Sequence, residues 1–202
     1  MLPRPGMPCR VLIMRLLLAL VPLLATAATA ASTPAYRYQI DSRSSLIDAK
    51  VTVLGIARKS AQFPKMSGGI VLSPGQLGAI RMDVAVDARA MATRDPKVGD
   101  QLKGPDFLDV ARHPMVSFSG QRMTMTGPQT AQIAGQLTAR GTSRPTVMKV
   151  TFATPPAQIT GREPVQITAQ TTIDRRQFGM NGYGGLVGKD VTITIKARMV
   201  PN

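Results

Sequence analysis

The chain has 202 residues, and its 25 Lys and Arg outnumber its 11 Asp and Glu, which gives a formal net charge of +14. One Cys and one His exclude an internal disulfide framework and most metal sites built from those ligands, and no cofactor is expected. The absence of Trp, with only three Tyr and five Phe, argues against the base-stacking platforms of single-stranded nucleic-acid binders.

The first thirty residues have the three parts of a secretory signal peptide. Three arginines precede the apolar run Leu16–Leu24, and two small-x-small cleavage sites follow, the second ending at Ala30. The apolar run is too short for a membrane-spanning helix, which needs about 20 residues. We therefore expect residues 1–30 to be removed on export and residues 31–202 to form one periplasmic domain. The alternative is an N-terminal anchor that is never cut.

Export separates the domain from nucleic acid, so we expect no nucleic-acid partner even though the isoelectric point is about 11.1. The anionic partners that remain are a membrane surface, a phosphate-bearing lipid or an acidic polymer. For most of the Lys and Arg, a solvated basic surface is the simpler interpretation.

Alternation of apolar and polar residues dominates the rest of the chain and predicts strands with one apolar and one wet face. Short candidate strands come first, at residues 36–40, 46–54, 56–63 and 69–72. More alternating runs follow at residues 80–87, 115–119, 121–125, 132–138, 148–152, 165–173 and 191–198. Only residues 88–114 lack clean alternation, and there Asp95 and Pro96 predict the start of a short helix that ends near Leu102.

A sheet of eight or more such strands must hide its edges, so it splits into a sandwich or closes into a barrel. An eight-stranded barrel has room inside for packed side chains or for one small ligand. The expected fold class is therefore all-β and antiparallel with a short helical insertion, either a sandwich or a barrel.

No motif predicts catalysis. His113 has no second His, no Cys after the signal peptide and no obvious Ser partner, so a structural role is the simpler interpretation. Four aspartates between Asp95 and Asp109 have no known metal-ligand spacing, and Asp commonly caps helices and shapes turns. The glycine-rich segment 182–188 precedes a strand and lacks the spacing of a dinucleotide fingerprint. Nine methionines after residue 30 suit either a loosely filled core or an adaptable apolar pocket.

Three ordered stretches narrow the interpretation. The first reads TRD at 93–95, DQLKGPDFLD at 100–109 and HPMVSF at 113–118; the second reads GQLTARGTSRP at 135–145; the third reads IDRRQFGM at 173–180 and VGKDVTI at 187–193. Together they resemble the YceI-like family of bacterial, usually periplasmic, lipid-binding proteins, and the resemblance runs from about Tyr36 to Val200. It implies a lipocalin-like barrel around an apolar cavity that holds a polyisoprenoid or another long-chain amphiphile.

We expect nine apolar side chains to line that cavity: Phe63, Met82, Val84, Phe107, Phe118, Phe152, Ile167, Phe178 and Met180. Arg94 and Arg175 are the candidates for a phosphate or carboxylate head group, because the guanidinium offers a planar fork to such anions. For both arginines, structural pairing with a nearby Asp is the alternative.

The expected function is the sequestration and carriage of a long-chain lipid, whether polyisoprenoid, fatty acid or amide. A structural or interaction barrel with a filled interior is the alternative, and an enzyme acting on a lipid is a second one. The chain departs from the family pattern in its first long strand, where members usually carry a His and a Phe. Here the stretch Ser45–Val53 has no His, and Ala49 stands about where the aromatic would be. The ligand therefore need not be an isoprenoid.

Overall fold

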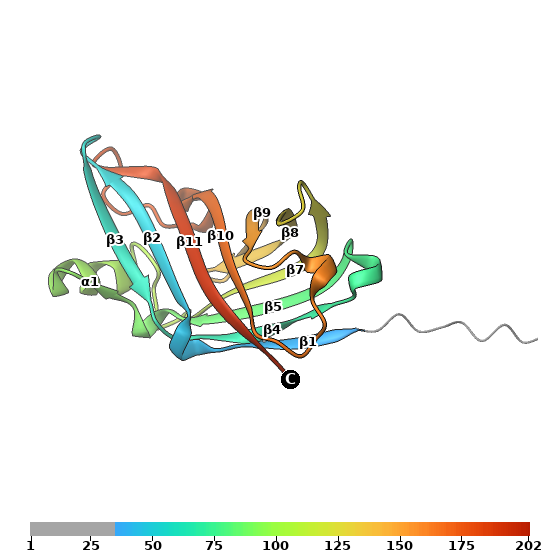
Figure 1. The fold of residues 1–202 in the computed structure, drawn as a ribbon. Coiled ribbons are helices and arrows are strands. Elements are labelled where there is room, and N and C mark those ends of the chain that lie inside the picture. The colour runs from blue at the N-terminus through green and yellow to red at the C-terminus, as the bar shows by residue number, and fades with distance from the viewer. Residues whose placement is uncertain (1–34) are drawn as a thin grey trace, which may run out of the picture. The chain divides into compact units, whose positions relative to one another are not determined.

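The computed structural model describes residues 35–202, so the predicted signal peptide lies outside the described residues. Eleven strands make up most of the described chain (Figure 1). They are β1 (Tyr36–Ile40), β2 (Leu46–Val53), β3 (Ala57–Phe63), β4 (Met66–Leu72), β5 (Ala79–Asp87), β6 (Ala92–Thr93), β7 (Met115–Met125), β8 (Thr130–Ala139), β9 (Thr142–Phe152), β10 (Val165–Asp174) and β11 (Val187–Pro201). Between them lie the helix α1 (Pro96–Lys103) and the short 3-10 helices η1 (Ser42–Ser44), η2 (Pro74–Gln76), η3 (Ala88–Ala90), η4 (Pro156–Gln158) and η5 (Arg175–Phe178).

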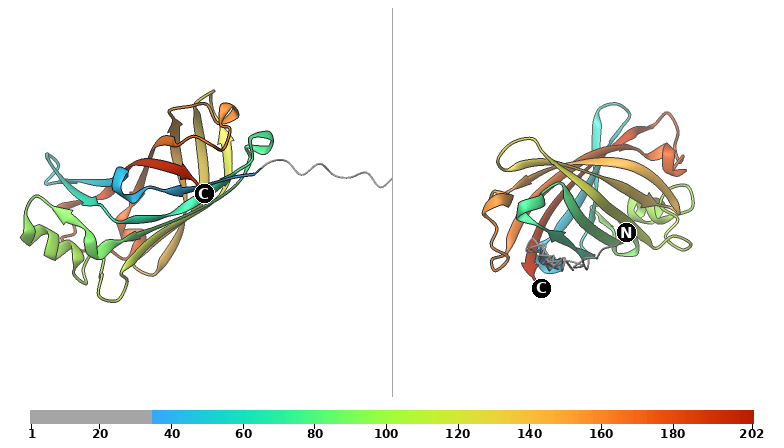
Figure 2. Two further views of the ribbon diagram at one scale, coloured as in Figure 1. Left: turned by 60° about the horizontal axis from the view of Figure 1, so that its bottom comes forward. Right: turned by 90° about the vertical axis from the view of Figure 1, so that its right-hand side faces the viewer.

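Eight strands close into a barrel in the order β1-β4-β5-β7-β8-β9-β10-β11, and β11 returns to β1. The strand β11 is long enough to pair with β2 through Val187–Lys196 and with β1 through Met199–Pro201. The strands β2, β3 and β6 extend the same sheet beyond this ring, next to α1 (Figures 1 and 2). The closed antiparallel barrel confirms the predicted fold class, and the short helix at 96–103 confirms the predicted insertion.

Two strands differ from the sequence-based prediction for local reasons. The runs 115–119 and 121–125 are one strand, β7, because a register shift between Gly120 and Arg122 inverts the alternation without ending the pairing with β8. The strand β9 begins at Thr142 rather than Met148. Its first part, which contains Pro145, pairs with β8 only, since β10 pairs with β9 from Lys149 onward. A proline is tolerated there because its missing N–H faces no partner strand.

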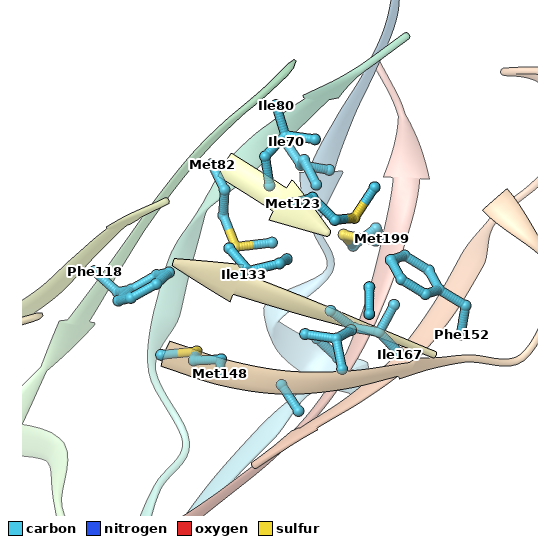
Figure 3. Packing of buried hydrophobic residues seen from close by; sticks show 14 of the residues in the cluster. Ile70, Ile80, Met82, Phe118, Met123, Ile133, Met148, Phe152, Ile167 and Met199 are labelled. Atoms are coloured by element: carbon cyan, nitrogen blue, oxygen red, sulfur yellow. The ribbon is translucent and has the colours of Figure 1, made fainter. Parts of the chain in front are cut away.

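The inward-facing side chains form two apolar clusters. The larger one lies among β4, β5 and β7–β11 and includes Ile133, which is completely buried (Figure 3). The smaller one centres on Phe63, Met66 and Met91 near the extended part of the sheet. Within residues 35–202, α1 is too short and too polar to serve as a membrane span.

Candidate ligand-binding cavity

A cavity of about 540 Å³ lies inside the barrel, and each of the eleven strands contributes at least one residue to its wall. Most of the wall is aliphatic, because the inward-facing residues of the alternating strands are mainly Ile, Val, Leu, Ala and Met. Six methionines belong to it: Met66, Met82, Met91, Met148, Met180 and Met199. The volume falls within the range of roughly 300–1,000 Å³ found for small-molecule sites, so the cavity has room for one apolar ligand.

Cationic side chains gather at one end of this cavity. Arg58, Lys59 and Arg94 line it and are exposed to solvent, and we call the end that they define the mouth. Lys59 lies on the same side of β3 as the buried Ala61, because successive strand residues alternate between the two faces. Arg94 directly follows β6, which pairs with β3 at Thr93 and Ala61. The mouth is therefore built by the β3–β6 edge of the sheet.

The structure brings seven of the nine predicted apolar residues together in the cavity wall. Val84 is half-buried, and the other six are almost fully buried: Phe63, Met82, Phe107, Phe118, Ile167 and Met180. Contact with a ligand stays a prediction for each of them.

The other two predicted residues, Phe152 and Phe178, lie outside the cavity wall. Phe152 does face inward, but it is the last residue of β9 and packs in the core cluster that contains Met123 and Met199 (Figure 3). Phe178 lies in η5, after the alternation of β10 has ended, and its side chain is 2% exposed within the same cluster. Both are core residues outside the cavity wall, because alternation predicts the face of a strand and not the depth along the barrel.

The guanidinium of Arg175 borders the cavity, but its N–H groups are hydrogen-bonded to backbone carbonyls. Arg175 Nε donates to Gly188 O at 2.9 Å, Nη2 donates to Val187 O at 2.9 Å, and Nη1 donates to Met180 O. Burial, with the charge of Arg176 as a smaller cause, lowers the pKa of this guanidinium. Arg175 therefore fastens the segment after η5 to the start of β11. Arg175 forms no ion pair with an Asp, and its guanidinium does not project freely at the mouth. Its geometry therefore does not support the predicted head-group role.

The same guanidinium lies over an aromatic ring that connects the cavity to the surface. The Arg175 Cζ is 5.6 Å from the ring centre of Phe107, which is within the range of a cation–π contact. The Phe107 ring in turn lies 6.0 Å from the ring of Tyr183, which is exposed in the loop before β11. These contacts fix the 181–186 loop beside the cavity wall.

Of the two predicted head-group arginines, only Arg94 lies exposed at the mouth. The sequence-based prediction missed Lys59, which also lines the cavity and is exposed at the mouth. The sequence did indicate this position, because Lys59 precedes Ala61 and Phe63 at two-residue spacing and so lies on their inward face.

A family model for the YceI-like domain matches residues 38–199. The chain belongs to this family. UPF0312 proteins of Pseudomonas putida (strain GB-1) and of Pseudomonas fluorescens (strain SBW25) are each 26% identical to it, over 158 and 149 residues. These matches cover 77% and 74% of the chain and 82% and 78% of the relatives.

Two solved structures share the fold of this YceI-like domain. BcnA of Burkholderia cenocepacia superposes with a TM-score of 0.71 at 18% identity, over 79% of this chain and 98% of that one. A polyisoprenoid-binding domain from Saccharophagus degradans, implicated in plant cell wall breakdown, superposes with a TM-score of 0.61 at 10% identity, over 82% and 98%. The predicted family resemblance is confirmed.

Chemistry-bearing residues elsewhere in this YceI-like domain have structural partners. His113 lies outside the cavity wall and stands against the Gly141 turn, and its backbone N–H donates to Asp109 O at 2.8 Å. The buried carboxylate of Asp109 pairs with Arg112 at 2.7 Å. Across residues 35–202, no three His, Cys, Asp or Glu side chains come together as a metal site.

The turn that positions Arg175 is held by an ion pair on its outer side. Asp174 Oδ1 accepts from the Arg176 backbone N–H at 2.9 Å, and its two carboxylate oxygens accept from Arg176 Nε and Nη2 at 3.1 and 2.9 Å. Hydrogen bonding to the Arg176 side chain is the main cause that lowers the pKa of Asp174 from 3.8 to about 2. Arg175 is then the residue of this turn that points inward.

Acid should weaken this turn. Because the pKa of Asp174 is lowered in the folded state, the stabilisation is complete above about pH 4 and is lost as the pH falls toward 2. Arg176→Gln is expected to reduce the loss of unfolding free energy between pH 4 and pH 2, measured by urea titration. Arg122→Gln, which removes an exposed cation that has no ion-pair partner within residues 35–202, serves as the control. Equal acid sensitivity of both variants and the parent would contradict the assignment.

Proposed function

We propose that this YceI-like domain binds one long-chain apolar or amphiphilic lipid inside the barrel and carries it in the periplasm. The observation that carries the proposal is the apolar cavity of about 540 Å³, since a barrel with a filled interior would have no such space. The polyisoprenoid-binding domain from Saccharophagus degradans has the same fold, which supports a lipid as the ligand class. The signal-peptide pattern of residues 1–30 supports the periplasm.

The cavity wall is suited to apolar chains that differ in shape. Met side chains are unbranched and polarisable, so six of them can adjust to more than one ligand contour. Burial of each methylene contributes roughly 0.8 kcal/mol, and ten methylenes contribute about 8 kcal/mol before several kcal/mol are lost to association and ordering. Micromolar affinity corresponds to about 8 kcal/mol, so roughly fifteen buried methylenes would supply it without a specific polar contact.

The polar group of such a ligand belongs at the mouth. Lys59 and Arg94 are exposed there and line the cavity, so a phosphate or carboxylate at the end of the chain would meet two cations. Arg175 already donates to three carbonyls and is left out of this role.

Narrowing the cavity tests the proposal. Ala49 lines the cavity from the half-buried middle of β2, so Ala49→Phe places a ring in the space. If the ring displaces two methylenes, the affinity for a fluorescent long-chain fatty acid should fall by more than tenfold, which corresponds to roughly 1.6 kcal/mol. Ala134→Phe makes the same change at an exposed position of β8 and should leave the affinity unchanged. Native mass spectrometry of the parent after addition of the acid should show one bound molecule.

The proposal fails if the parent binds neither the fatty acid nor its neutral alcohol, or if Ala49→Phe binds both as tightly as the parent while it remains folded. A variant that binds the alcohol normally and the acid weakly after Arg94→Gln or Lys59→Gln would support the assignment of the mouth.

A further inference from the structure

Large apolar side chains are exposed on two loops beside the mouth. Within residues 35–202 seven such side chains are exposed, and the four most exposed lie here: Ile56 at 88%, Leu54 at 64%, Tyr183 at 54% and Leu186 at 52%. We call these four residues the rim patch. Leu54 and Ile56 form the tip of the β2–β3 hairpin, and Tyr183 and Leu186 belong to the loop before β11.

The two loops lie side by side and support each other through their backbones. Leu54 N–H donates to Leu186 O at 2.8 Å, and Val53 pairs with Val187 in the sheet. Figures 1 and 2 show the hairpin tip next to the loop before β11.

The backbone N–H groups of Leu54, Ile56 and Leu186 are paired within these loops. Ile56 N–H donates to Val53 O at 3.3 Å, and Leu186 N–H donates to Tyr183 O at 3.1 Å. Each paired N–H lowers the cost of moving these tips out of water, because it has no water partner to give up.

The surroundings of the rim patch are basic. The hairpin from Asp48 to Phe63 carries Lys50, Arg58 and Lys59 against the single carboxylate of Asp48, which pairs with Lys50 at 2.9 Å. The facing segment 181–188 carries no charge. Apolar tips, an exposed tyrosine and flanking cations are the combination that favours the interface of an anionic bilayer. The mouth opens at the same place, since Val51, Lys59 and Val187 line the cavity within a few residues of the tips.

We propose that the rim patch docks this domain, mouth first, on an anionic phospholipid bilayer. Four side chains on two narrow loops are far fewer than the roughly 20–30 residues that each partner gives to a stable protein interface. A bilayer needs no such area, because shallow insertion of a few side chains is reinforced by attraction of cations to anionic head groups. Docking in this orientation would let a lipid pass between the bilayer and the cavity without crossing water, and only this consequence rests on the proposed function.

Vesicle binding of the full chain tests the docking. The parent should bind vesicles of phosphatidylglycerol and phosphatidylcholine, and the double variant Ile56→Ser, Leu186→Ser should bind them at least tenfold more weakly, since each apolar side chain contributes about a factor of ten. Val147→Ser removes an exposed apolar side chain from β9 and should change nothing. Residues 1–34 are common to all variants, so their contribution cancels.

The charge of the surroundings is tested in the same way. The double variant Arg58→Gln, Lys59→Gln removes two exposed cations that form no ion pair within residues 35–202. It should lose about fivefold in affinity for each cation removed, and part of the salt dependence of binding. Its matched control is Lys149→Gln, Arg162→Gln, which removes two exposed cations from β9 and from the turn before β10. Equal losses in both double variants would overturn a localised docking surface.

Depth is measured at a single tryptophan, because the chain has none of its own. Brominated phospholipid should quench the fluorescence of Ile56→Trp and leave that of Val147→Trp unquenched. Equal quenching at both positions, or unchanged vesicle binding of the Ile56→Ser, Leu186→Ser variant, overturns the proposal. So does a parent that forms dimers which this variant abolishes, because the rim patch would then join two copies of the chain.

Lipid titration without vesicles separates the two proposals. Neither Ile56 nor Leu186 lines the cavity, so the variant that loses docking should bind the fluorescent fatty acid as the parent does. A parent that docks on vesicles but binds no long-chain probe would uphold the docking and remove the proposed function.

Discussion

Arg175→Met is expected to lower the free energy of unfolding by about 3–5 kcal/mol, because three carbonyl oxygens lose a charged donor at once. The side chain is 3% exposed, and the carbonyls of Met180, Val187 and Gly188 have their hydrogen bonds from this guanidinium. Urea denaturation, followed by circular dichroism at neutral pH, measures the change.

Two further variants show whether geometry or charge is responsible. Arg175→Lys keeps a positive charge without the planar fork, so it should recover only a small part of the lost stability. Arg176→Met removes the exposed neighbour that pairs with Asp174, and a solvent-exposed pair contributes far less than the three hydrogen bonds of the buried Arg175. Loss of similar size in the Arg175→Met and Arg176→Met variants would contradict the role of Arg175 as a backbone clamp.

Phe178→Ala is expected to lower the free energy of unfolding by roughly 3–5 kcal/mol and to leave ligand affinity of the folded fraction unchanged. The ring is among the largest fully buried side chains and does not line the cavity. Denaturation measures the first effect, and titration of the fluorescent fatty acid into folded protein measures the second.

Phe118→Ala is the matched comparison. Phe118 is buried to a similar degree but belongs to the cavity wall, so its loss should change both stability and affinity. If Phe178→Ala weakened lipid binding as much as Phe118→Ala, the cavity would extend to η5, contrary to the structure.

Alternation was enough to predict an antiparallel all-β sheet, because such a sheet places every second residue inside, and the family resemblance added the barrel. The segments that alternate cleanly, such as 165–173, match their strands closely. The prediction failed where geometry departs from a simple ladder. The register shift at Gly120 and Arg122 made β7 look like two strands, and the first half of β9 alternates around a proline.

The sequence predicted which side chains face the barrel interior, but not how far along the barrel each one lies. Phe118 and Phe152 both face inward, yet only Phe118 reaches the cavity, because the far end of the barrel is filled by residues of other strands. Arg175 could not be placed from sequence, since its partners are backbone carbonyls up to thirteen residues away that carry no side-chain signal. Lys59 was predictable, because it precedes the inward-facing Ala61 and Phe63 at two-residue spacing.

The dual pairing of β11 also determines when the molecule can fold. Tyr38 pairs with Pro201, so the contact that seals the ring joins the first described strand to the last. Proteins dominated by such distant contacts fold slowly, because a long loop must close before the contact forms. Without β11, the edges of β10 and β2 would both stand open to pairing with other chains. The barrel therefore cannot close before β11 has been made, and a chain that stays open until then suits the predicted export.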